Sequence, residues 1–365
     1  MHVSLLRSVH RTTDPARAHF FFVPTWDFHG SWGNPEVYLR AHRYVVTHWP
    51  FWNVSGGEDH IWVVTRDAGT CSTPWGTVWE QLRSSIILSN WGGITGLGGV
   101  PTERCFDVTR DLVVPGVLRA NIVRSSPFIS FYRSAATAAE AAAMAAASPA
   151  PWANRKTLLF FHGALCWQIY DKVRDEHGLK RKCKQKHGFI DHYSFGVRYE
   201  IWRRFHHEPH FELRATDLLP PPSHISLDEA MTHSLFCLCP SGTGWGMRVF
   251  HSATLGCIPV ILQDDGRYPS VLQAFEGLLL DYDEFTVRLE AHQLPKLPSI
   301  LRNIVGNATR MAAIRVALLR MWTRLLWRVA LARPEAKALA GAPDAFESVM
   351  AALELRRRHG LKLAN

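Results

Sequence analysis

Apolar residues follow two different spacings along this chain. Short apolar runs that end at a proline, a glycine or a polar residue predict buried strands, at residues 19–24, 59–65, 129–132, 155–163, 211–214, 234–239 and 258–262. Apolar residues three or four positions apart predict helices, at residues 36–49, 193–205, 227–232 and 344–357, with a helix and then a strand within residues 79–89 and a long helical stretch after residue 300. Strands that alternate with helices predict an α/β fold, with a parallel sheet covered by helices on both faces.

An alanine-rich stretch divides the chain in two. Residues 135–151 are mostly alanine and close with Ser-Pro-Ala-Pro, which is typical of a connector. We therefore expect an N-terminal domain at residues 1–134, a C-terminal domain at residues 152–340 and a closing helix within residues 341–365. The inward residues expected of the helix at 36–49 are Val37, Leu39, Tyr44, Val45 and Trp49.

The composition is that of a globular protein with a basic surface. The chain has 365 residues, 47% of them hydrophobic, and a net charge of +9. A basic balance favours anionic ligands such as nucleotides, and a solvated basic surface explains it equally well. The dense basic run at residues 180–186 has no interleaved aromatic residue, so nucleic acid is not an expected partner.

The seven cysteines contain no CxxC pair, so a structural zinc site is not expected. Cys237 and Cys239 lie on an apolar run and are predicted to be plain core residues. Cys71 and Cys105 lie in loop-like surroundings, where they can pair in an oxidising compartment. No apolar stretch predicts a signal peptide or a membrane-spanning helix.

The segment FCLCPSGTGWGMRVFHSATLGCIPVIL, residues 236–262, places three glycines between a predicted strand and a predicted helix of roughly ten residues. Free N–H groups and the positive end of the helix dipole attract an anion there. Gly242, Gly244 and Gly246 let the backbone approach that anion closely. Arg248 falls in the first turn, where a cation opposes the dipole, so its presence is favourable if a bound phosphate lies beside it.

Two alternatives stay open for this loop. The loop can also be a tight turn whose glycines serve packing, because glycines alone are weak evidence for a ligand. It lacks the Gly-Lys-Ser/Thr of a Walker A motif, and its Gly-x-Gly-x-Gly spacing differs from the Gly-x-Gly-x-x-Gly of dinucleotide sites. Asp264 and Asp265 nevertheless stand about 20 residues further on, where a ribose-binding acid of a dinucleotide site is expected.

Six stretches span nearly the whole chain: RTTDPARAHFFFVPTW, WPFWNVSGGEDHIWVVTRDAG, RKTLLFFHG, YSFGVR, the glycine segment and DAFESVMAAL. Together, and in this order, they resemble the exostosin (GT47) glycosyltransferases of plants and green algae. The resemblance implies a GT-B fold, with two Rossmann-like domains facing across a cleft, the first binding the acceptor and the second the nucleotide sugar. It also implies inverting transfer of a sugar from a nucleoside diphosphate, usually UDP, to a glycan or glycoprotein, without a required metal or cofactor, at the Golgi membrane.

The resemblance also assigns roles to residues. One set of residues would hold the diphosphate, ribose or sugar of the donor, or would line the cleft. These residues are Ser241, Gly242, Thr243, Gly244, Arg248, Asp265, Glu276, His162 and Gly163. An inverting transfer needs a base for the acceptor hydroxyl. Asp59, with His60 beside it, is the expected base; the alternative is a turn cap next to a structural histidine. Further candidates for the base or for acceptor contact are Asp67, Asp27 and His29, and candidates for stacking on sugar rings are Trp49, Trp62 and Trp245.

The chain departs from the family pattern in two places. His251 stands where many members have an acidic residue, three places after the arginine of the glycine segment. The strand, stem and membrane anchor that precede RTTDP in the family are missing, so the N-terminal domain is expected to be incomplete. These departures keep an alternative open, a catalytically inactive relative that binds glycan or a partner transferase. The sequence does not specify the donor sugar or the acceptor.

Overall fold

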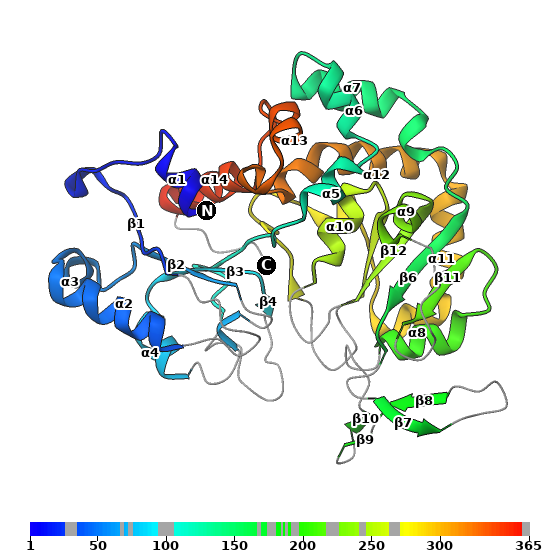
Figure 1. Ribbon diagram of the computed structural model, residues 1–365, viewed down its shortest axis with the longest axis horizontal. Coiled ribbons are helices and arrows are strands. Elements are labelled where there is room, and N and C mark those ends of the chain that lie inside the picture. Colours follow the sequence, from blue (N-terminus) through cyan, green and yellow to red (C-terminus); the bar gives the residue numbers. More distant parts are fainter. Residues whose placement is uncertain are drawn as a thin grey trace.

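The structure, a computed structural model, describes residues 1–25, 35–65, 69–71, 76–93, 106–165, 169–173, 180–183, 185–186, 189–190, 197–216, 226–240, 246–262 and 271–359. Two parallel sheets lie beside each other, one in each half of the chain (Figure 1). The predicted α/β class is therefore confirmed.

The N-terminal sheet has four parallel strands. In spatial order they are β1 (Phe21–Phe22), β2 (His60–Val64), β3 (Ile86–Ser89) and β5 (Leu112–Val113). Its outer helices are α2 (Pro35–His48), α3 (Phe51–Ser55) and α4 (Gly76–Leu82). Trp62 on β2 is fully buried with Tyr38 and Trp52 from α2 and α3. Burying such aromatic side chains stabilises the packing of these helices on the sheet by about 2–3 kcal/mol each.

The C-terminal sheet has five parallel strands. In spatial order they are β11 (Phe211–Ala215), β6 (Thr157–Gly163), β12 (Ser234–Pro240), β13 (Ile258–Leu262) and β15 (Val287–Arg288). The helices that alternate with them are α8 (Val197–Phe205), α9 (Leu227–Thr232) and α10 (Arg248–Thr254). All five residues of β13 are buried, as expected for a strand covered on both faces.

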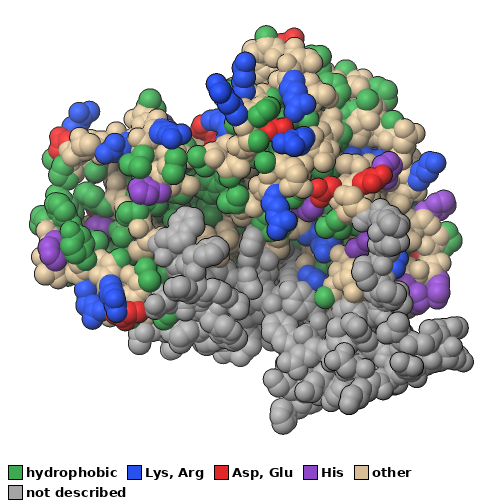
Figure 2. Space-filling model, viewed as in Figure 1, with side chains coloured by type: hydrophobic (Ala, Val, Ile, Leu, Met, Phe, Trp, Pro, Cys, Tyr) green, Lys and Arg blue, Asp and Glu red, His purple; other side chains and the backbone are tan. Residues whose placement is uncertain are grey.

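The remaining elements complete the two halves. They are the helices α1 (His2–Leu6), α5 (Ala120–Arg124), α6 (Ile129–Ser134), α7 (Ala138–Ala147), α11 (Leu297–Gly306), α12 (Ala308–Met321), α13 (Arg333–Ala338) and α14 (Ala345–His359), and the short strands β4 (Gly92–Gly93), β7 (Ile169–Val173), β8 (Lys180–Cys183), β9 (Gln185–Lys186), β10 (Phe189–Ile190) and β14 (Val271–Leu272). Basic side chains on the face seen in Figure 2 are spread over several elements, which fits a solvated basic surface.

The two halves share contacts and one apolar core. β4 from the first half pairs antiparallel with β14 from the second. Trp327 Nε1 donates to the carbonyl of Pro115 at 2.7 Å. A single cluster of buried side chains runs from Leu88 on β3 to Phe160 on β6. Side chains of the two predicted domains therefore pack together across the expected boundary between them.

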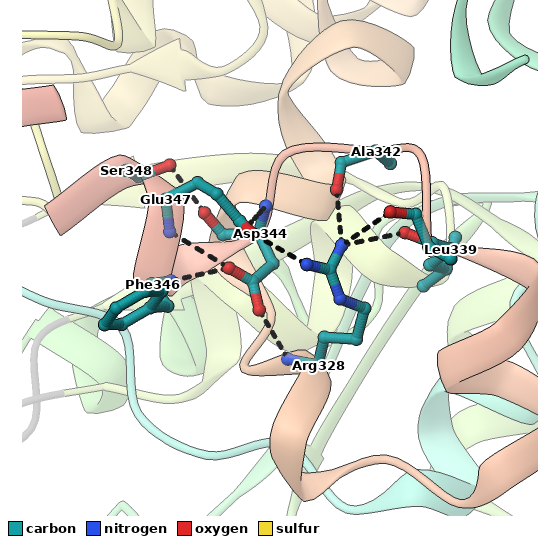
Figure 3. A network of polar contacts seen from close by, with 8 residues as sticks. Arg328, Leu339, Ala342, Asp344, Phe346, Glu347 and Ser348 are labelled. Atoms are coloured by element: carbon teal, nitrogen blue, oxygen red, sulfur yellow. Dashed lines mark hydrogen bonds and ion pairs between the residues drawn. The ribbon is translucent and has the colours of Figure 1, made fainter. Parts of the chain in front are cut away.

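Helix α14 begins at a polar network (Figure 3). Asp344 Oδ1 accepts from the backbone N–H of Phe346 at 2.8 Å and of Glu347 at 3.1 Å. The Arg328 guanidinium donates to Glu347 Oε1 at 2.6 Å and to the carbonyl of Ala342 at 2.8 Å. Acceptors at a helix start satisfy N–H groups that have no partner within the helix. The network therefore fixes where α14 leaves the C-terminal half and turns towards the first sheet.

Most elements lie where the sequence placed them, with clear exceptions. Residues 129–132 begin helix α6 and do not form the predicted strand. Tyr44 in α2 and Trp49 just after it are exposed, while Tyr38 of α2 faces the core. The alanine-rich stretch is more than a linker, because it forms α7, which packs on α12. The helix after the glycine loop has 7 residues and is shorter than predicted.

Cysteine placement differs from the sequence prediction at one residue. Cys237 is bonded to Cys257, with an S–S distance of 2.02 Å, and so is not a plain core residue. Cys239 is free and buried, as predicted. The pair joins β12 to the chain entering β13, which are neighbouring parallel strands. The suggested pairing of Cys71 with Cys105 cannot be followed, because Cys105 and the side chain of Cys71 lie outside the described part of the chain.

Candidate functional site

The carboxyl ends of β6 and β12 lie at one edge of the C-terminal sheet, because these strands are parallel neighbours. In open α/β sheets, ligands bind outside that edge. The predicted glycine loop connects the end of β12 to Arg248, the first residue of α10, at the same edge. Outside the described residues lie the predicted site residues Ser241, Gly242, Thr243, Gly244 and Asp265.

Arg248 is held against the end of β6. Its Nη2 donates to the carbonyl oxygen of His162 at 2.8 Å, and its guanidinium carbon lies 4.8 Å from the ring centroid of Phe161. A Cβ at Gly163 would lie 2.8 Å from Phe161 Cζ and 3.1 Å from Arg248 Nη2. The lack of a side chain at Gly163 therefore leaves room for the guanidinium. The structure brings three of the predicted site residues, Arg248, His162 and Gly163, together at the end of β6.

His162 contributes to this arrangement through its backbone. Its side chain is 10% exposed, and Nε2 lies 2.9 Å from Glu212 Oε1 on β11. The imidazole also packs against Phe160, with ring centroids 4.5 Å apart. The carbonyl of His162 thus positions Arg248, while its imidazole ring packs against side chains of the sheet.

His251 is paired with an acid from another helix. It lies one turn after Arg248 on α10, and its Nε2 is 2.7 Å from Asp228 Oδ1 on α9. Burial lowers the pKa of His251, and the charge of Asp228 and its hydrogen bond only partly oppose that shift. A neutral imidazole that donates Nε2–H to the carboxylate leaves Nδ1 as an acceptor. The residue that departs from the family pattern therefore still has an acid beside it.

Glu276 does not present a free carboxylate. Its Oε1 accepts from Arg288 on β15, and its Oε2 accepts from the backbone N–H of Gln273 at 2.7 Å. It lies in a tight turn between Phe275 and Gly277, which both have positive φ. The predicted ribose contact would compete with these internal bonds, so we assign Glu276 first to holding this turn.

Asp59 and His60 lie at the amino end of β2. Asp59 Oδ1 accepts from Ser55 Oγ at 2.6 Å and lies 2.7 Å from His60 Nδ1. The His60 ring packs on Phe21 and Trp52, at centroid distances of 5.1 and 4.8 Å. Only 2% of the His60 side chain is exposed, and burial lowers its pKa. The enclosed ring fits the structural alternative, and a catalytic role for His60 stays a prediction.

The same placement argues against Asp59 as the base. The carboxyl edge of this sheet is the one that faces the second half, because β4 follows β3 there and pairs with β14. Asp59 precedes β2 and so lies at the opposite edge. The structure does not bring it to Arg248. Among the other candidates for base or acceptor contact, Asp67, Asp27 and His29 lie outside the described residues.

Sequence reasoning missed one residue at this site. Arg198, the second residue of α8, donates through Nη1 to the carbonyl of Ala164 at 3.3 Å. Its guanidinium carbon lies 5.6 Å from the same Phe161 ring that Arg248 contacts. The available signal was the arginine that closes the YSFGVR motif, which carries no chemistry until the fold places it beside β6.

Three further observations concern the remaining sequence predictions. Of the tryptophans proposed to stack on sugars, Trp62 is fully buried, Trp49 is exposed at the end of α2, and Trp245 lies outside the described residues. Within the described ranges, no group of three His, Cys, Asp or Glu side chains is placed to hold a metal ion. Among the helices that the structure describes, none has the length and apolarity that crossing a bilayer requires.

Comparison with known proteins identifies relatives of this chain. The model of the Exostosin GT47 domain matches residues 1–304. Two probable glucuronosyltransferases of Oryza sativa subsp. japonica are 26% and 27% identical, over 83% and 99% of this chain and 63% and 74% of their own lengths. The probable glucuronoxylan glucuronosyltransferase IRX7 of Arabidopsis thaliana is 27% identical, over 84% of this chain and 59% of its own length.

Proposed function

Since this chain belongs to the Exostosin GT47 family of glycosyltransferases, we propose that it transfers a sugar, with inversion, from a UDP-sugar to a glycan or glycoprotein acceptor. The names of its relatives make UDP-glucuronic acid the first donor to test. The observation that carries the proposal is the position of Arg248, held at the carboxyl edge of the C-terminal sheet by the His162 carbonyl and the Phe161 ring.

The mechanism follows from the charge on the leaving group. As the bond to the sugar breaks, negative charge develops on the β-phosphate of the nucleoside diphosphate. A cation that is already in place stabilises that charge without reorganisation. Arg248 has this quality, because Gly163 leaves room for its guanidinium and His162 fixes its orientation. We expect the reaction to need no metal, with protein groups alone neutralising the diphosphate.

We further propose that the two sheets belong to the two Rossmann-like domains of a GT-B enzyme, with the donor on the C-terminal one. Residues 1–134 and 152–340 would form these domains, with residues 135–151 as connector and 341–365 as closing helix. The base would then come from the carboxyl edge of the N-terminal sheet. Because Asp59 lies at the other edge, Asp67, which follows β2 in sequence, becomes the preferred candidate.

A Golgi lumenal location is part of the same proposal. The Cys237–Cys257 disulfide supports it, because disulfides form and persist in oxidising compartments. The alternative of a catalytically inactive relative is favoured by none of these observations, and His251 has Asp228 beside it. Titration with UDP separates the two, since an inactive relative without a donor site would not bind it.

The first prediction concerns Arg248. Replacing it with alanine removes the charge that faces the leaving group, so we expect the transfer rate to fall by about 10²–10³-fold. The measurement is release of UDP from UDP-glucuronic acid, then from the UDP-linked forms of xylose, galactose, arabinose and N-acetylglucosamine, each with and without EDTA. Arg203→Ala, on the exposed side of α8 and paired with Glu200, is the control. Unchanged turnover in Arg248→Ala would refute the mechanism, and loss of turnover with EDTA would refute metal independence.

A further inference from the structure

Two stretches of the chain match the acceptor pattern for N-linked glycosylation. The pattern is Asn-X-Ser/Thr, where X is any residue except proline. It occurs at Asn53 with Ser55 and at Asn307 with Thr309, and the pattern alone does not rank the two. A glycan is bulky and polar, so the asparagine that carries it must lie at the surface. The surroundings of the two stretches in the folded chain differ.

Asn307 lies in an open connection between two helices. It follows α11 and is the N-cap residue of α12. Residues 305–310 are all exposed, and a Cβ added at Gly306 would meet nothing within 4 Å. The backbone of Asn307 is extended, with φ −100° and ψ 93°. The asparagine and the threonine of this stretch are therefore both accessible to a transferring enzyme.

The side chain of Asn307 can carry a glycan and keep its role in the fold. Its Oδ1 accepts from the backbone N–H of Arg310 at 2.9 Å and so caps α12. The amide nitrogen Nδ2 is a separate donor group of the same side chain. N-linked glycosylation uses only Nδ2 and leaves Oδ1 as an acceptor, so the cap and the glycan are compatible.

The other stretch is less suited to modification. Asn53 lies within α3, which packs on the sheet through the buried Trp52. Ser55, the third residue of the pattern, is half-buried, and its Oγ donates to Asp59 Oδ1 at 2.6 Å. The pattern requires a hydroxyl side chain at this place, and here the hydroxyl is already bonded within the fold. We therefore expect modification of Asn53 to be disfavoured once α3 has formed.

We propose that Asn307 carries an N-linked glycan. This inference rests on the lumenal location that is part of the proposed function and that the Cys237–Cys257 disulfide supports. The co-substrate is a lipid-linked oligosaccharyl diphosphate. A bond forms between Asn307 Nδ2 and the anomeric carbon, and the bond from that carbon to the diphosphate oxygen breaks. The electron pair of the broken bond leaves with the lipid diphosphate, which also takes up the one proton that the amide loses.

A glycan at Asn307 would leave the candidate functional site open. In Figure 1, α11 lies on the side of the C-terminal half that faces away from the N-terminal sheet. The helix α10, which begins at Arg248, lies on the side next to the first half, where it contacts α5. Loss of the glycan should therefore leave the release of UDP from a UDP-sugar unchanged.

The test is production of the full chain, behind a cleavable secretory signal, in a eukaryotic host. Digestion with peptide N-glycosidase converts a glycosylated asparagine to aspartate, so peptide mass spectrometry identifies the modified position. We expect Asn307 to be modified and the protein to shift in electrophoretic mobility on digestion. The shift should be lost in Asn307→Asp, which keeps an oxygen to cap α12. Asn53→Gln, the matched control, should retain it.

A second pair of variants tests the acceptor pattern without altering the asparagine. Thr309→Ala should lose the mobility shift although Asn307 and its cap are intact. Thr309→Ser keeps the hydroxyl group and should retain the shift. A glycan that persists on Asn307 in Thr309→Ala would overturn the inference, because the modification would then not follow the pattern.

The outcomes separate this inference from the function on which it rests. An unmodified Asn307 in the secreted, folded protein would overturn the inference, whether or not that protein releases UDP from a UDP-sugar. A glycan on Asn53 alone would overturn it too. A glycan on Asn307 in a protein that does not bind UDP would support the inference and overturn the proposed transferase activity.

Discussion

At the scale of single residues, Gly163 is a sterically constrained position of the site. A methyl group there would lie 2.8 Å from Phe161 Cζ and 3.1 Å from Arg248 Nη2. We expect Gly163→Ala to displace the guanidinium and to weaken UDP binding several-fold, measured by calorimetry. Gly341→Ala is the matched control, because nothing lies within 4 Å of its added Cβ. Equal UDP affinities in these two variants would show that the close approach at Gly163 does not position Arg248.

Single residues also show where sequence reasoning reached its limit. The motif identified Arg248 because glycines and a predicted strand surround it. The sequence leaves both a catalytic and a structural role open for His60, because a histidine at a strand start looks the same whether its ring faces solvent or packs on Phe21 and Trp52. The apolar run predicts a plain core residue at Cys237, because spacing along the chain does not show that Cys257, just before the next strand, lies beside it.

At the scale of elements, strands covered on both faces were the most predictable. β6, β12 and β13 are continuous apolar runs, and each formed within a few residues of its predicted bounds. Residues 129–132 are as apolar as a strand, yet they form part of a helix whose Ile129 and Tyr132 are buried. A short apolar run fits either structure, and here packing decides.

Asp111 couples two of these elements and gives a pH prediction. It accepts from the backbone N–H of Ile87 on β3 at 2.9 Å and of Asp107 at 2.8 Å. Burial raises its pKa from 3.8 to about 6, so the folded chain holds this proton more tightly than the unfolded chain. The protonated Asp111 carboxyl therefore contributes its full share to the free energy of unfolding below pH 3.8. That share is lost as pH rises through about 6, and the loss amounts to about 3 kcal/mol.

Chemical denaturation between pH 4 and 7 measures this contribution as the difference between the unaltered protein and Asp111→Asn. As pH rises, the free energy of unfolding of the unaltered protein should fall relative to that of Asp111→Asn. Asp107→Asn is the control whose difference from the unaltered protein should stay nearly constant between pH 4 and 7, because the pKa of Asp107 is lowered from 3.8 and this group therefore titrates below that range. Burial would raise the pKa of Asp107, but hydrogen bonds from Thr109 and the charge of Arg110 outweigh it and lower that pKa. A pH-independent difference for Asp111→Asn would mean that Asp111 does not titrate as described.

At the scale of the whole molecule, the two halves do not behave as separate packing units. The apolar cluster that contains Leu88 on β3 also contains Trp322 and Phe160 of the second half. In Figure 1, α14 runs from the C-terminal half back towards the N-terminal sheet. Sequence patterns locate each half through its own strands, but contacts between distant segments leave no periodicity to read. This is why the continuity of the core was not predicted.

The last prediction tests this continuity through Arg356 on α14. Its Nη2 donates to the carbonyls of Val108 and Asp111 in the first half. Burial lowers the pKa of this guanidinium to about 10, and removing a largely buried donor leaves its acceptors unpaired. We expect Arg356→Ala to lower the free energy of unfolding by about 2 kcal/mol. Arg357→Ala, whose exposed side chain pairs only with Glu354 on the same helix among its described contacts, should change it little.

The shape of the unfolding curve is as informative as its midpoint. Because one core joins the halves, tryptophan fluorescence and far-ultraviolet circular dichroism should report a single coincident transition in the unaltered protein. In Arg356→Ala that transition should move to lower denaturant and stay single, since the shared apolar cluster remains. Two separated transitions in the unaltered protein would mean that the halves unfold independently, and that the packing between them contributes little to stability.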